Sequence, residues 1–231
     1  MIICFTMNQP IFITGAERSG SSLIARIFSM CGAFTGVINK MYENVELKQI
    51  CHTYLEKYKV NNELICPTKS LTIPINWKEK VDAILLGCEC YKDGPWMFKD
   101  SQLTRMWPVW HFAYPNAKWV IVRRKTPDII HSCVKTSYMK MFKDVKNCMK
   151  VNAKTEQEGW LWWIHEYEKR FVEMIEAGVN IKQVWPERMV TGDYQQIYET
   201  LEWLGLPWDY KIVETIDPLL TKSRRNEIWL A

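Results

Sequence analysis

Apolar residues in this chain gather in short runs, and between the runs they recur every three or four positions. The first run, residues 11–14, leads into Gly15, and residues 21–31 then show helical spacing that stops at Gly32. Lys118–Arg123 is a second run, rich in β-branched residues and of the length of a strand buried on both faces. The pattern therefore predicts a strand, a glycine-rich turn and a helix, with a further strand later in the chain.

The same reasoning predicts short strands over residues 96–99, 181–185 and 188–191, and helices over residues 41–60, 101–112, 127–141, 156–178 and 194–204. A polar, proline-containing stretch over residues 61–78 is predicted to be a loop or lid. Strands that alternate with helices favour a mainly parallel sheet with helices on both faces. No repeat or shift in composition divides the chain, so we expect one α/β domain over residues 1–231.

The composition and net charge limit the kinds of ligand and the cellular location that we expect for this protein. Of the 231 residues, 48% are hydrophobic and 24% are charged, which is ordinary for a globular protein. The net charge of +4 fits an anionic ligand, but there is no concentrated basic stripe of the kind that nucleic-acid binders show. The apolar residues 1–5 lack the flanks of a secretory signal and the length of a membrane span, so we expect a cytoplasmic protein. The dispersed cysteines and histidines predict no metal site.

The glycine turn has the form of a phosphate-binding loop. Residues 15–22 read Gly-Ala-Glu-Arg-Ser-Gly-Ser-Ser, which fits the G-x-x-x-x-G frame between a strand and a helix. Main-chain N–H groups at the start of the helix hold an anion there, and the hydroxyls of Ser21 and Ser22 add donors. On the frame alone, a tight turn that binds nothing stays an equal alternative.

One departure decides which phosphate suits the loop. Nucleoside triphosphate loops place lysine after the second glycine, and this sequence has Ser21 there, with Arg18 as the loop's cation. The apolar run before Arg123 and Arg124 also lacks the aspartate that would hold magnesium. These differences disfavour transfer of a γ-phosphate and favour a donor with a single 5′-phosphate.

A basic residue followed by Ser-Gly-Ser-Ser after a short strand resembles the 5′-phosphosulfate loop of PAPS-dependent sulfotransferases. The resemblance implies a P-loop-type three-layer fold, PAPS (3′-phosphoadenosine 5′-phosphosulfate) as donor, PAP (3′,5′-adenosine bisphosphate) as product, and no metal. The candidate donor contacts in the loop are Glu17, Arg18, Ser19, Gly20, Ser21 and Ser22.

A second motif supports the same resemblance. Arg124 ends a predicted strand, and Ser132 follows eight residues later on the next helix, with Asp128 between them, as in the family's 3′-phosphate site. An arginine at a strand's carboxyl end beside a helix hydroxyl makes a second anion site. Arg224 resembles in position a further donor contact of the family. Taken alone, the pair Arg123 and Arg124 also fits an exposed basic surface.

Sulfuryl transfer needs a base for the acceptor's proton and cations for the departing phosphate. Arg18 is the first candidate cation, and Lys99, in a segment that resembles the family's Lys-Asp-Pro-Arg, is the second. The family uses His or Glu as base. Because residues 42–44, Tyr-Glu-Asn, resemble the acceptor segment of bacterial relatives, Glu43 is the candidate base, with Glu46 in reserve.

The sequence leaves the acceptor open among sugars, lipids, peptides and small phenols, and it leaves the oligomeric state open. We expect a small-molecule or glycan acceptor and no nucleic-acid partner. A P-loop small-molecule kinase and a non-catalytic nucleotide-binding protein are the alternative functions. The aromatic residues at positions 160, 162, 163 and 167 share one predicted helix and cannot all face inward. The sequence therefore leaves open whether each of them packs in the core or lines an acceptor cleft.

Overall fold

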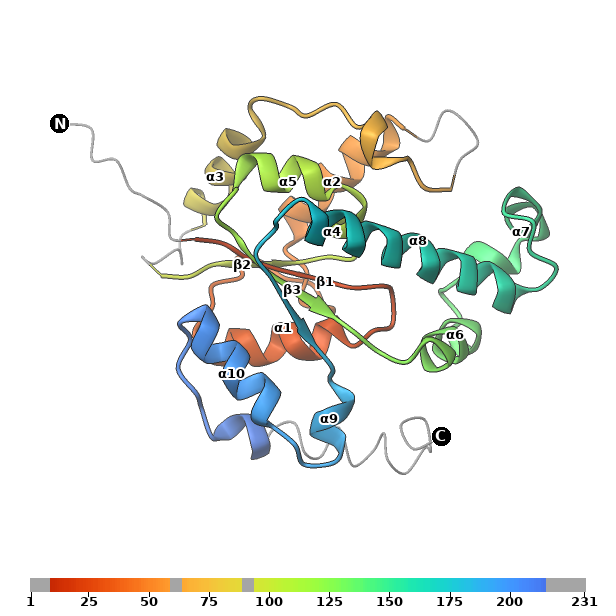
Figure 1. Ribbon diagram of the computed structural model, residues 1–231. Helices are drawn as coiled ribbons and strands as arrows, with labels where there is room; N and C mark the ends of the chain where they lie inside the picture. The colour runs from red at the N-terminus through yellow and green to blue at the C-terminus, as the bar shows by residue number, and fades with distance from the viewer. Residues whose placement is uncertain (1–8, 59–63, 89–93, 215–231) are drawn as a thin grey trace.

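The computed structural model describes residues 9–58, 64–88 and 94–214. Within these residues, one all-parallel sheet has the strand order β2–β1–β3–β4 (Figure 1). Its strands are β1 (Ile11–Thr14), β2 (Met97–Lys99), β3 (Lys118–Val122) and β4 (Ile181–Val184). Parallel neighbours require crossover connections, and helices lie between each strand and the next. The predicted α/β fold with a parallel sheet and helices on both faces is confirmed.

The helices fall between these strands and after the last one. In chain order they are α1 (Ser21–Met30), α2 (Val45–Glu56), α3 (Trp77–Leu86), α4 (Gln102–Arg105), α5 (Trp107–Ala113), α6 (Thr126–Lys135), α7 (Val145–Lys150), α8 (Glu156–Glu176), α9 (Glu187–Val190) and α10 (Gln195–Leu204). Two 3₁₀ turns, η2 (Thr68–Ser70) and η3 (Met141–Lys143), join them. Among the described helices, none combines the length and apolar composition that crossing a membrane requires.

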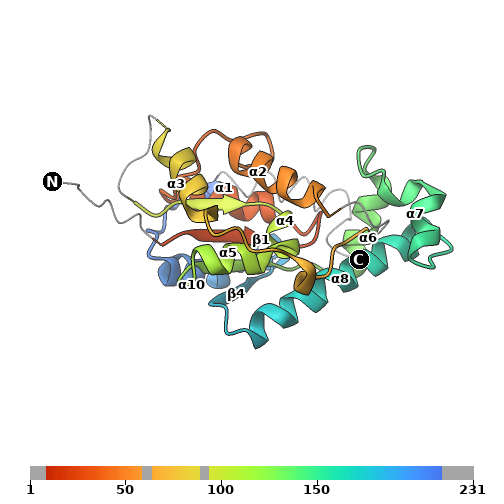
Figure 2. The ribbon, with the colours of Figure 1, turned by 90° about the horizontal axis from the view of Figure 1, so that it is seen from above.

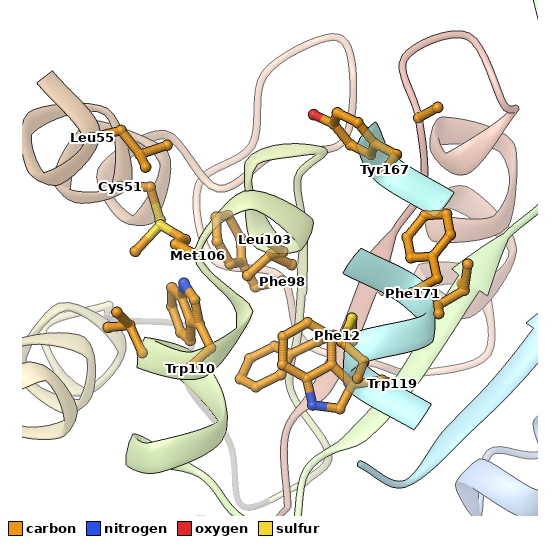
Figure 3. Close-up of a cluster of buried hydrophobic side chains, with 14 of the residues drawn as sticks. Phe12, Cys51, Leu55, Phe98, Leu103, Met106, Trp110, Trp119, Tyr167 and Phe171 are labelled. Carbon is orange, nitrogen blue, oxygen red and sulfur yellow. The ribbon is translucent and has the colours of Figure 1, made fainter. Parts of the chain in front are cut away.

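The alternation of side chains along the strands divides the core into two layers. Phe12 and Trp119 pack with α2, α3, α5 and α8 on one face, while Ile13 and Val120 pack with α1, α9 and α10 on the other. The first layer is aromatic: the Phe12 ring meets the rings of Trp110 and Trp119 edge-on, with centroids 5.0 and 4.8 Å apart (Figure 3). Both faces of the sheet are therefore covered, as its continuous apolar strands predict.

Two predicted helices differ from those observed. The helix expected over residues 101–112 divides at Met106, whose φ of −128° is not helical, and α5 begins directly after it with Pro108 in its first turn. The helix expected over residues 127–141 ends at Lys135, where the backbone of Thr136 turns to an extended conformation, and the Thr136 hydroxyl donates to the Ser132 carbonyl at 2.6 Å. Figure 2 shows α6, α7 and the start of α8 grouped at one end of the molecule.

One further prediction about a single segment is wrong, and another holds, within the described residues, only as far as residue 76. Residues 188–191 do not form a strand, since Glu187–Val190 is the short helix α9, and Arg188 pairs with Asp193 just beyond it. The loop expected over residues 61–78 gives way to α3 at Trp77, and this helix was not predicted. Its buried residues Trp77, Val81 and Leu85 recur every four positions, which is a helical signal that the sequence does contain.

Candidate active site

A cleft of about 400 Å³ opens at the carboxyl ends of β1 and β2, which is where α/β sheets bind ligands. The loop after β1, the residues after β2 and β3, and the turn before α2 all contribute to it. Its lining residues are Glu17, Arg18, Gly20, Ser21, Ser22, Met41, Glu43, Lys48, Lys99, Asp100, Ser101, Gln102, Arg124, Tyr138 and Met139.

Backbone geometry explains the two glycines of the loop. A Cβ atom at Gly15 would lie 2.5 Å from the Val122 carbonyl oxygen, so only glycine lets the loop pass this close to β3. Gly20 has a φ of 96° and caps α1 without a side-chain hydrogen bond. No side chain of Gly20 therefore covers the start of α1, where Leu23 N–H donates to the Gly20 carbonyl oxygen at 3.0 Å and Ser21 and Ser22 border the cleft.

The loop cation and the predicted second anion site lie together. Arg18 Nε donates to Ser132 Oγ at 2.9 Å, and Arg18 Nη1 donates to the Tyr138 hydroxyl at 2.8 Å. Arg124 Nη1 donates to the Arg18 carbonyl oxygen at 3.0 Å. The loop thus meets both ends of the β3–α6 motif, which lies more than 100 positions further along the chain, at one edge of the cleft.

The two adjacent arginines after β3 differ in their surroundings. Arg124 is buried beside the loop, and burial lowers the pKa of its guanidinium. Arg123 points elsewhere: it pairs with Glu168 at 2.7 Å and its guanidinium lies over the rings of Phe171 and Trp185. The exposed basic pair that the sequence left open is therefore not what the structure shows, because each arginine has its own partners.

At the other edge of the cleft, a buried ion pair joins β2 to the turn before α2. Lys99 Nζ donates to Glu43 Oε1 at 3.0 Å and to Ser22 Oγ at 3.2 Å, so this cation lies next to the first turn of α1. Lys48 pairs with the second carboxylate oxygen of Glu43. Both Lys99 and Glu43 are almost fully buried, at 5% and 7% exposure.

A tight turn fixes the position of Glu43. The side-chain oxygen of Asn39 accepts the N–H groups of Met41 and Glu43, and Tyr42 adopts a positive φ of 59° between them. Asn39 Nδ2 also donates to Glu43 Oε2 at 2.9 Å. Burial alone raises the pKa of Glu43, but the charge of Lys99 and the hydrogen bonds it receives outweigh burial and lower the pKa below its ordinary value.

Asp100 is a second carboxylate at this edge. Its Oδ1 accepts the Gln102 N–H at 2.9 Å, and within the described residues its Oδ2 has no hydrogen-bond partner. The residue is 1% exposed, and burial raises its pKa to about 6. Asp100 directly follows Lys99 in the segment that resembles the family's Lys-Asp-Pro-Arg, although no role was predicted for it from the sequence.

Glu17 borders the cleft, but its carboxylate is held by the fold. It accepts the Trp163 indole N–H at 2.6 Å, the Tyr167 hydroxyl at 3.1 Å and the Ser101 hydroxyl at 3.0 Å. These bonds tie the loop to α8, so Trp163 and Tyr167 belong to the core and also support the loop. Ser19 is buried under the loop at 1% exposure and does not line the cleft.

Two other predicted site residues are not found in the lining of the cleft. Glu46, the reserve base, is exposed on the first turn of α2 and lies outside the cleft lining. Arg224 lies outside the described residues. Sequence reasoning did not name Lys48, Asp100 or Tyr138 as site residues. Asp100 lies in the same motif as Lys99, whereas Lys48 and Tyr138 reach the cleft through tertiary packing. In the part of the chain that the structure describes, no group of three or more His, Cys, Asp or Glu side chains could hold a metal ion.

The geometry defines an α/β protein with a glycine loop of the form that the sequence analysis predicted to bind phosphate, an arginine beside it and a buried Lys–Glu pair in the same cleft. The model of the Sulfotransferase family matches residues 10–210. This chain belongs to the sulfotransferase family, as its motifs indicated, and the family is one of enzymes.

Similar solved structures include sulfotransferase STF9 from Mycobacterium avium, at 10% identity with a TM-score of 0.54, covering 94% of this chain and 68% of that one. Sulfotransferase STF1 from Mycobacterium tuberculosis matches at 12% identity with a TM-score of 0.48, covering 89% of this chain and 70% of that one. At such identity the likeness to STF9 shows the fold alone. No curated protein matches the chain significantly.

Proposed function

We propose that this protein transfers a sulfuryl group from PAPS to a hydroxyl or amine of a small-molecule or glycan acceptor. The observation that supports this most is that the phosphate loop, the Arg124–Ser132 site and the Lys99–Glu43 pair border one cleft or contact residues that do. A phosphate loop, a basic site or a buried ion pair by itself also occurs in proteins of other functions. Together they offer two anion sites, a cation and a carboxylate within reach of one ligand.

The described residues fit a donor with two separate phosphate groups. The uncapped first turn of α1, with Ser21 and Ser22, suits the 5′-phosphosulfate, and Arg124 with Ser132 suits the 3′-phosphate. Arg18 lies between the two sites and contacts Ser132 directly. Ser21 stands where a P-loop kinase has lysine, which disfavours the kinase alternative.

PAPS, when bound, supplies a sulfuryl group whose sulfur exchanges its bond to the 5′-phosphate oxygen for a bond to the acceptor oxygen or nitrogen, leaving PAP. In this proposal Arg18 and Lys99 stabilise the charge that grows on the departing phosphate. Lys99 already contacts Ser22 at 3.2 Å, so its ammonium is next to the proposed phosphate site. No metal is part of the proposal.

Glu43 is the proposed base for the proton that the acceptor loses. The carboxylate is ionised at neutral pH, as a proton acceptor requires, but the cation and hydrogen bonds that lower its pKa also make it a weaker base while they are in place. In the structure Lys99 and Lys48 hold its two oxygens. We infer that Lys99 turns toward the donor's phosphate during the reaction, which leaves Glu43 Oε1 to the acceptor.

Replacing Glu43 tests this assignment. We expect Glu43→Gln to lower the rate of sulfate transfer from PAPS by about a hundredfold or more while changing PAP affinity little. The matched control is Glu46→Gln, three residues away and exposed, which should transfer sulfate at the wild-type rate. An active Glu43→Gln variant would remove this residue from the role. A wild-type protein that binds PAP but transfers sulfate to no acceptor would favour the non-catalytic alternative.

A further inference from the structure

A second hollow opens beside the cleft. It has a volume of about 360 Å³ and shares Glu17, Tyr138 and Met139 with the cleft itself. Its other lining residues are Lys140, Met141, Trp160 and Trp163. We call this space the aromatic hollow. Because the two spaces share three residues, one bound molecule can extend from the reacting groups into the hollow.

The walls of the aromatic hollow suit an apolar, ring-sized group. Two indoles and two thioethers face it, and sulfur and aromatic rings both make favourable contacts with aromatic ligands. Packing fixes the walls: Trp160 and Trp163 are each 2% exposed, and the Phe142 ring meets Trp160 edge-on with centroids 5.0 Å apart. The hydrogen bond from Trp163 to Glu17 orients the second indole. The hollow is therefore preformed.

A different hollow lies on the opposite side, beyond Lys48. Its lining residues are Asn39, Val45, Lys48, Gln49 and His52, so it is polar and would suit a sugar. It shares only Lys48 and not a continuous wall with the cleft, and the ammonium of Lys48 is engaged by Glu43. The aromatic hollow has the more continuous path to the reacting groups.

We propose that the aromatic hollow binds the body of the acceptor, which makes the acceptor an aryl alcohol or a similarly apolar alcohol. This inference rests on the proposed function, because it is the sulfuryl acceptor that the hollow would hold. The acceptor's ring lies against Met141 and the two indoles, and its hydroxyl reaches back past Met139 toward Glu43. Glu17, Tyr138 and Lys140 also line the hollow, but four of its seven lining residues are indoles or thioethers, so a sugar would satisfy fewer of its hydroxyl groups there than in water.

Binding of two probes to the wild-type protein tests the inference without turnover. With PAP present, isothermal titration calorimetry measures the dissociation constants of 2-naphthol and of N-acetylglucosamine. We expect 2-naphthol to bind at least tenfold more tightly, which is the order of effect that burial of one apolar ring produces. The same titration first records whether PAP itself binds.

A substitution at Met141 can test the aromatic hollow without changing the lining of the main cleft. Met141 lines the hollow and not the main cleft, so Met141→Asp places a charge against the proposed ring. We expect about a tenfold loss of 2-naphthol affinity, with unchanged PAP affinity showing that the variant folds. Met141→Ala should show a smaller loss. Met149→Asp is the matched control, because Met149 is 71% exposed on α7 and lines neither space.

The outcomes distinguish this inference from the proposed function. A wild-type protein that does not bind PAP would refute the proposed function itself. If PAP binds but Met141→Asp leaves 2-naphthol affinity unchanged, the inference is wrong and the proposed function stands. If N-acetylglucosamine binds more tightly than 2-naphthol and loses affinity in Gln49→Ala, the acceptor uses the polar hollow, which also overturns the inference.

Discussion

The charged side chains at the two edges of the cleft have different kinds of partner. At the loop edge, Arg18 and Arg124 donate hydrogen bonds to neutral oxygens, those of Ser132, Tyr138 and the backbone, and the carboxylates of Asp128 and Glu187 act on Arg124 only through their charge. At the opposite edge, Glu43 is surrounded by Lys99, Lys48 and Asn39, which together compensate its charge. The first arrangement is suited to receive an anion, and the second to hold a carboxylate ionised.

This difference predicts that mutations at the two edges have different signatures. Removal of Arg18 or Arg124 at the loop edge mainly changes anion binding, because their hydrogen bonds there go to neutral oxygens. Removal of a cation at the opposite edge leaves the buried carboxylate of Glu43 with less compensating charge and therefore also destabilises the fold.

The largest effect is expected at Lys99. Lys99→Met should reduce sulfate transfer by about a hundredfold to a thousandfold, since it removes a donor from the site of developing charge. It should also lower the free energy of unfolding by about 3 kcal/mol, because Glu43 loses its most buried counter-ion. Urea unfolding and an assay of sulfate transfer measure the two effects separately.

A double variant separates the two roles of Lys99. Glu43→Gln in the Lys99→Met background should restore most of the lost stability without restoring activity, because no buried charge then lacks a partner. Lys118→Met, which removes a partly buried cation outside the cleft, controls for loss of a lysine in a strand. Full activity in Lys99→Met would contradict the proposed contrast between the two edges.

The pH dependence of stability should report on Asp100. Its pKa rises from an ordinary 3.8 to about 6 in the folded protein because burial disfavours the charged form. The folded state therefore holds the proton more tightly. The contribution of this group to stability is greatest below pH 4 and is lost as pH rises through about 6, by up to about 3 kcal/mol.

Asp100→Asn keeps an oxygen for the Gln102 N–H and removes the charge. We expect its free energy of unfolding, measured in urea between pH 4 and pH 8, to fall less with rising pH than that of the wild type. Glu43 should affect the pH dependence of stability in the opposite direction to Asp100. Its pKa is lowered in the folded protein, so its contribution to stability is lost as the pH falls through its folded-state pKa. Identical pH profiles for the wild type and Asp100→Asn would show that Asp100 ionises like an exposed residue.

The sequence predicted those features that depend on neighbours along the chain. The strand–loop–helix unit at residues 11–30 and the strand that ends before Arg124 form as expected, since apolar runs and glycine turns are local signals. The error at residues 188–191 has a local cause too, because Pro186 starts a helical turn that a short apolar stretch does not reveal. The apolar pattern also does not mark the end of α6, where Thr136 turns to an extended backbone.

The sites were only partly predictable for a similar reason. The spacing of Arg124 and Ser132 identified two residues that meet near Arg18, since a strand and the following helix place them in a fixed relation. Spacing does not show that the Glu17 carboxylate faces Trp163 and Tyr167, or that Lys48 and Asp100 reach the cleft. Those contacts join segments up to 150 positions apart in the chain, as between Glu17 and Tyr167.

Two anion sites in one cleft are proposed to receive the two phosphates of one nucleotide. The most direct measurement compares the dissociation constants of PAP and AMP, which differ by the 3′-phosphate, for the wild type, Arg124→Gln and Arg123→Gln. We expect the wild type to prefer PAP by about tenfold to a hundredfold, the range of a charged hydrogen bond. That preference should disappear in Arg124→Gln and persist in Arg123→Gln. Equal affinity of the wild type for PAP and AMP would contradict the two-site proposal.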